Sequence, residues 1–143
     1  MLTVTYGQLR DSNFGRAISK LANFNGYKSP QVAYNVAKIN RRLLDEAKLA
    51  EELYRQLVER YADKTEDGKI KPVEGRGPDS FMIPDAVSEE WGAKVTEYHA
   101  IAFEIDRPRI GLDGVADAKL TPAEIMALDP VLQFEDEDAS AEE

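Results

Sequence analysis

The chain contains no cysteine and a single histidine, His99. Without cysteine it can form neither a disulfide nor a thiolate metal site, and it has no cysteine nucleophile. One histidine is too few for a histidine-based zinc site, so we interpret His99 as a residue at a helix end. These absences predict that folding requires no bound metal.

Long hydrophobic runs are missing as well. No stretch approaches roughly 18 consecutive apolar residues, so we expect no membrane-spanning helix and no membrane partner. The first seven residues, Met-Leu-Thr-Val-Thr-Tyr-Gly, include neither a basic region nor an apolar core. We therefore expect no secretory signal peptide.

Motifs for nucleotide or acyl chemistry are also absent. The chain has no Gly-x-x-x-x-Gly-Lys loop, no Gly-x-Gly-x-x-Gly fingerprint and no Gly-x-Ser-x-Gly elbow to present a serine nucleophile. Glu89, Glu90, Glu97 and Glu104 offer paired carboxylates, but acids on an amphipathic helix usually form only its solvated face. We therefore expect no enzymatic activity and no cofactor.

Acidic residues are abundant: 27 Asp and Glu against 18 Lys and Arg give a net charge of −9. A negative surface repels phosphate backbones, so we expect no direct sequence-specific binding to nucleic acid. Much of the excess lies in residues 135–143, which hold six acids and no base. This segment is predicted to be either a flexible, solubilising tail or an arm that docks on a basic partner.

The first half of the chain has the pattern of a helical hairpin. Alternating apolar residues over 2–6 predict a short strand, and Thr5 and Gln8 have the spacing of a capping box that starts a helix. Gly26 ends that helix, and a Ser-Pro pair starts a long second helix over about 30–62. The short connection predicts antiparallel packing of the two helices.

The long helix carries an apolar seam with a heptad period, formed by Val36, Asn40, Leu43, Ala47, Ala50, Tyr54, Leu57 and Tyr61. Asn40 either fixes register or oligomeric state or faces the open side of this stripe. The first helix is too short to cover the far half, from about 49 to 61. We expect Tyr54, Leu57 and Tyr61 to pack there on a third helix and sheet or on another subunit.

The second half is predicted to add a third helix and a small sheet. Asp85 caps a helix over about 85–99. The segments assigned to a mainly antiparallel sheet are residues 2–6, 69–73, 80–83 and 101–112. Thr121 and Glu124 form a second capping box before a short last helix. The expected fold class is α+β, with one domain over 1–134 followed by the acidic tail.

One segment has the spacing of a calcium-binding loop. The residues at oxygen-ligand positions of this EF-hand pattern are Asp63, Thr65, Asp67 and Glu74. Pro72 lies inside the loop, however, and Gly-Arg-Gly-Pro follows where the exiting helix should begin. We favour a turn at the Asp-Gly pair and assign no metal, with calcium binding as the alternative.

Because no site chemistry is visible, we expect function to reside on exposed surfaces. The candidates are the long helix, the Gly-Arg-Gly-Pro loop and the apolar segment before the tail. Apolar anchors supply most of the affinity in protein interfaces. The predicted interaction residues are Tyr54, Leu57, Tyr61, Arg76, Leu132 and Phe134.

Four segments together point to a family. They are Leu-Thr-Val-Thr-Tyr-Gly-Gln-Leu at 2–9, Glu-Glu-Trp at 89–91, Ile-Ala-Phe-Glu-Ile at 101–105 and Leu-Thr-Pro-Ala-Glu-Ile-Met-Ala-Leu-Asp-Pro at 120–130. The chain resembles a family of small, functionally uncharacterised proteins of tailed bacteriophages over about residues 2–132. The last segment is the most specific, whereas the Gly-Arg-Gly-Pro loop and the acidic tail depart from the family.

The resemblance implies a phage origin and a place among virion or assembly genes, and it supplies no catalytic residues. We expect a structural or assembly component of a phage particle, in the capsid, head–tail junction or tail. Its partners would be other phage structural proteins or copies of itself. The alternative is a soluble phage accessory protein that binds and modulates a host enzyme. The expected location is the host cytoplasm, the virion or both.

Overall fold

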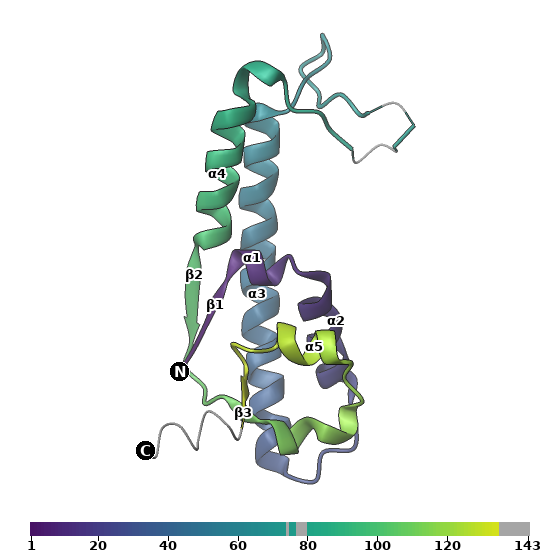
Figure 1. Ribbon diagram of the computed structural model, residues 1–143, viewed down its shortest axis with the longest axis vertical. Coiled ribbons are helices and arrows are strands. Elements are labelled where there is room, and N and C mark those ends of the chain that lie inside the picture. The colour runs from purple at the N-terminus through teal and green to yellow at the C-terminus, as the bar shows by residue number, and fades with distance from the viewer. Residues whose placement is uncertain (74, 77–79, 135–143) are drawn as a thin grey trace.

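A computed structural model describes residues 1–73, 75–76 and 80–134. It confirms the predicted α+β class, because helices surround one long central helix and short strands form two small sheets (Figure 1). The elements in chain order are β1 (Leu2–Thr5), α1 (Tyr6–Leu9), α2 (Ser12–Asn23), α3 (Pro30–Tyr61), the 3-10 helix η1 (Asp85–Val87), α4 (Ser88–Ala100), β2 (Ala102–Ile105), β3 (Ile110–Gly111), the 3-10 helix η2 (Leu112–Ala118), α5 (Pro122–Ala127) and β4 (Leu132–Gln133).

Helix α3 is the spine of the molecule (Figure 1). The Ser29 hydroxyl caps it by accepting a hydrogen bond from the N–H of Val32 at 3.3 Å. Pro30 occupies the first helical position, where a missing N–H costs nothing. With 32 residues, α3 is about 48 Å long at roughly 1.5 Å per residue. The predicted long helix is confirmed.

The predicted hairpin forms between α2 and α3, but its first arm is not one continuous helix. Asp11 interrupts it with the non-helical angles φ −69° and ψ 122°. Its carboxylate accepts a hydrogen bond from the N–H of Asn13 at 2.9 Å and so caps α2 separately. Aspartate is a preferred N-cap because it satisfies such unpaired N–H groups. Thr5 and Gln8 do form the predicted capping box, at the start of the short α1.

Helix α4 lies along the half of α3 that α2 does not reach (Figure 1). The buried Tyr98 hydroxyl donates a hydrogen bond to the carbonyl of Ala50 at 2.7 Å and joins the two helices. The prediction that Asp85 caps this helix is wrong. Pro84 precedes a separate 3-10 turn without a side-chain cap, and α4 proper begins at Ser88.

Strands β1 and β2 pair antiparallel, within two of the segments predicted to form the sheet, 2–6 and 101–112. Val4 lies opposite Phe103 in this register. The inward side chains of both strands are buried, whereas those between them are exposed. This alternation agrees with the period of two in the sequence.

The strands predicted at 69–73 and 80–83 are wrong. The described residues there are irregular, apart from one isolated bridge between Ile70 and Lys64. Pro72 lacks the N–H that a strand ladder needs. Instead, the Ser80 hydroxyl accepts a hydrogen bond from the N–H of Val73 at 2.8 Å.

The predicted segment 101–112 divides between two sheets. After a bend containing Pro108, β3 pairs in parallel with β4, placing Ile110 opposite Leu132. A parallel pair requires a crossover connection, which η2 and α5 supply. The second, smaller sheet is therefore parallel, so the segments predicted to form one sheet are divided between two.

Helix α5 begins with the predicted capping box. The Thr121 hydroxyl accepts from the N–H of Glu124 at 3.2 Å, and the Glu124 carboxylate accepts from the N–H of Thr121 at 2.9 Å. Leu128, Val131 and Leu132 follow and have no exposed surface. Buried residues from the N-terminal strand to β4 form one hydrophobic core. The predicted acidic tail, 135–143, lies outside the described residues.

Candidate protein-binding site

The segment with EF-hand spacing forms a tight turn. The N–H of Thr65 donates to the carbonyl of Lys69 at 2.7 Å, and the N–H of Gly68 donates back to the carbonyl of Thr65 at 2.9 Å. Gly68 adopts φ +80°, a conformation that residues with a side chain disfavour. The predicted turn at Asp67 and Gly68 is confirmed.

Among the described residues, the candidate calcium ligands Asp63 and Asp67 are not grouped with a third acidic or histidine side chain. The Asp63 carboxylate accepts a hydrogen bond from the N–H of Lys64 at 3.0 Å. Glu74 lies outside the described residues, and 80–84 contain no exiting helix. The part of the chain that the structure describes holds no group of three His, Asp or Glu placed to bind a metal ion.

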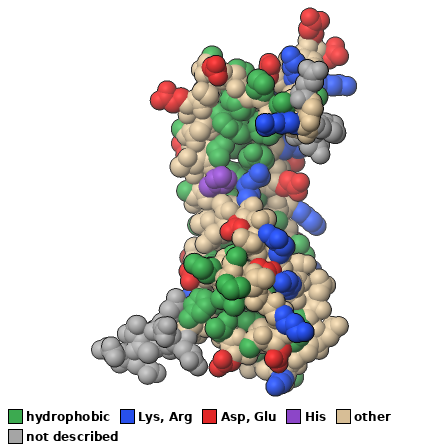
Figure 2. Space-filling model, turned by 45° about the vertical axis from the view of Figure 1, so that its right-hand side comes forward, with side chains coloured by type: hydrophobic (Ala, Val, Ile, Leu, Met, Phe, Trp, Pro, Cys, Tyr) green, Lys and Arg blue, Asp and Glu red, His purple; other side chains and the backbone are tan. Residues whose placement is uncertain are grey.

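Aromatic side chains join α3 to α4. The ring centroids of Tyr54 and Tyr61 lie 6.2 Å and 5.9 Å from that of Trp91. Phe81 reaches Trp91 from the preceding turn at 5.8 Å, and the Arg10 guanidinium lies 3.7 Å from the Tyr54 ring centroid. Figure 2 shows hydrophobic side chains gathered on one face over α3 and α4. Helix α4 of the same chain therefore covers both tyrosines.

A groove of about 490 Å³ opens between α3 and α4, and we call it the α3–α4 groove. Its lining residues are Leu53, Gln56, Leu57, Arg60, Lys94, Glu97, Tyr98 and Ile101. Ile101 is 40% exposed and forms part of the apolar floor. At the rim, Lys94 and Glu97 form an ion pair at 3.5 Å. An apolar floor within a polar rim is the usual organisation of a protein interface.

The three interaction residues predicted on α3 differ in their exposure and contacts. Leu57 lines the α3–α4 groove, and the half-buried Tyr54 packs on Trp91. Tyr61 is only 6% exposed, and its hydroxyl donates to Glu90 at 3.1 Å. Leu57 is thus placed to contact a partner, whereas Tyr61 stabilises the helix pair.

The predicted interaction residues outside α3 also differ in exposure. Arg76 is exposed in a turn, where its N–H donates to the carbonyl of Val73 at 3.1 Å. Leu132 has no exposed surface because β4 pairs with β3 inside the core, so it is a core residue and not a surface anchor. Phe134 is half-buried against the same core.

Ile101 lines the α3–α4 groove, although the sequence pattern had not indicated it as a binding residue. Its alternation with Phe103 predicted a strand position. In the structure it is the C-cap of α4, and its carbonyl accepts from the N–H of Tyr6 at 2.9 Å. It lies four residues after Glu97, and this helical spacing was the available signal for a shared face.

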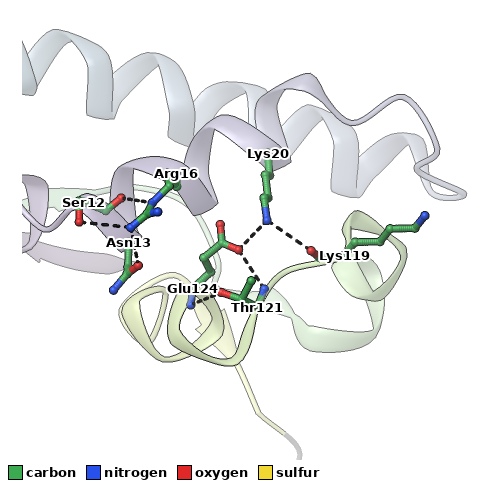
Figure 3. Close-up of polar contacts among 7 residues, drawn as sticks. All are labelled: Ser12, Asn13, Arg16, Lys20, Lys119, Thr121 and Glu124. Atoms are coloured by element: carbon green, nitrogen blue, oxygen red, sulfur yellow. Dashed lines mark hydrogen bonds and ion pairs between the residues drawn. The ribbon is translucent and has the colours of Figure 1, made fainter.

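The two largest pKa displacements among the described groups move away from neutral pH. Burial, followed by a hydrogen bond to Glu46, raises the pKa of Tyr6 to about 12. The hydrogen bond from Lys20 is the main cause that lowers the pKa of Glu124 to about 2, as seen in the contacts of Figure 3. Neither group is poised to exchange a proton at neutral pH, so neither supports acid–base catalysis.

No family model matches this chain, and no curated protein or solved structure matches it. Within residues 1–73, 75–76 and 80–134, no helix is both long enough and apolar enough to cross a membrane. The fold and surface geometry, with the sequence resemblance, are therefore the basis for the function.

Proposed function

We propose that this protein works by binding another protein in the α3–α4 groove, without catalysing a reaction, as a structural or assembly component of a tailed-phage particle. The observation that carries the binding role is an apolar groove of about 490 Å³ that remains open on a chain with a well-formed core. The phage assignment is supported by the resemblance over residues 2–132.

A helix of a neighbouring subunit fits this groove. Leu53 and Leu57 lie one turn apart on α3, and Ile101 faces the same groove from the end of α4. A guest helix inserts apolar residues at positions i, i+3 and i+4 into such a space. Arg60 on the rim makes no ion pair among the described residues and offers a charge-assisted hydrogen bond to a carboxylate on the guest.

Mass spectrometry of purified particles tests the assignment. We expect the protein in the particles, and we expect Ile101→Lys to lower its incorporation and the particle yield because a charge enters the apolar floor. Met126, which is 76% exposed and away from the groove lining, gives the matched control Met126→Lys. Absence of the protein from particles, together with unchanged yield for Ile101→Lys, contradicts the proposal.

A second function is favoured by the acidic composition of residues 135–143. A dense run of carboxylates presents repeated negative charge, as a nucleic-acid backbone does, and suits an accessory protein that occupies a basic surface of a host enzyme. In that case particles lack the protein, and a pull-down from infected cells recovers a host enzyme whose binding weakens with salt.

A further inference from the structure

We draw no further inference here: the strongest candidate, a second groove of about 330 Å³ between α2 and the N-terminal half of α3 with the exposed Leu44 at its edge, carries nothing because no feature of the described residues shows what covers it.

Discussion

At the scale of single residues, Glu124 connects local and tertiary structure. It is 3% exposed, and its Oε1 accepts from Lys20 Nζ at 2.6 Å and from the Thr121 N–H at 2.9 Å (Figure 3). Its Oε2 has no hydrogen-bond partner among the described residues. One carboxylate thus completes the N-terminus of α5 and ties α5 to α2. A buried charge of this kind depends on its partner.

The stability that Glu124 supplies should depend on pH. Its pKa is lowered from 4.5 to about 2, so the folded state favours the ionised form. The contribution is complete above the unfolded pKa, near 4.5, and is lost as pH falls through the folded pKa, near 2. Glu124→Gln should therefore destabilise at neutral pH, and the difference from the unaltered chain should shrink toward pH 2.

Urea denaturation at a series of pH values measures this difference. Glu66, an exposed acid in the turn, gives the control Glu66→Gln, which should follow the unaltered chain throughout. If the difference in unfolding free energy between Glu124→Gln and the unaltered chain does not change across this pH range, the ionised Glu124 carboxylate adds no pH-dependent stability.

At the scale of elements, the packing of α4 on α3 decides how the far half of the spine is covered. Trp91 is the only tryptophan of the chain and contacts both Tyr54 and Tyr61. Its fluorescence therefore reports directly on this helix pair. The hydrogen bond from the buried Tyr98 hydroxyl to the Ala50 carbonyl holds the C-terminal end of α4 against α3.

Leu57→Asp tests this packing. Leu57 is half-buried beside Tyr98, so a carboxylate there loses solvation and an apolar contact, and we expect a loss of about 1–3 kcal/mol. Urea unfolding followed by Trp91 fluorescence gives the value. Leu49→Asp, on an exposed position of the same helix, should change stability by less than about 0.5 kcal/mol. Equal midpoints for the two variants would mean that Leu57 does not support the α3–α4 packing.

At the scale of the whole molecule, charge and apolar surface are distributed unevenly. Figure 2 shows Lys and Arg side chains in succession along one face of a protein whose net charge is −9. The acids of residues 135–143 account for much of that net charge. Attraction between subunits through such charges acts over about 8–10 Å at ordinary ionic strength and weakens with salt.

Deleting residues 135–143 should weaken association with a basic partner modestly and flatten its salt dependence, because charge attraction is removed and apolar contact is kept. Phe134→Ala should weaken association more, since an aromatic anchor supplies more affinity than a screened charge. Phe134 also packs on the core, so circular dichroism must first show that both variants fold. The idea fails if deletion leaves the salt dependence unchanged.

Local sequence determined the long helix α3, the starts of α1 and α5, and the tight turn near Gly68. Ser29 and Pro30 start α3, and Thr121 with Glu124 starts α5, because a cap involves groups only a few residues apart. The heptad seam likewise marked the buried side of α3, since helical periodicity brings its residues onto one face. The turn at Gly68 followed from a dipeptide suited to positive φ.

Tertiary structure alone decided which apolar residues become core and which remain accessible. Leu132 was predicted as a surface anchor and Ile101 as a strand residue, yet Leu132 is enclosed by the pairing of β4 with β3 whereas Ile101 opens onto the α3–α4 groove. Parallel pairing joins segments about 20 residues apart through a crossover, and no local pattern specifies it. Both grooves arise because α2 and α4 each cover only part of α3. That coverage depends on how helices distant in sequence pack, which period and composition do not encode.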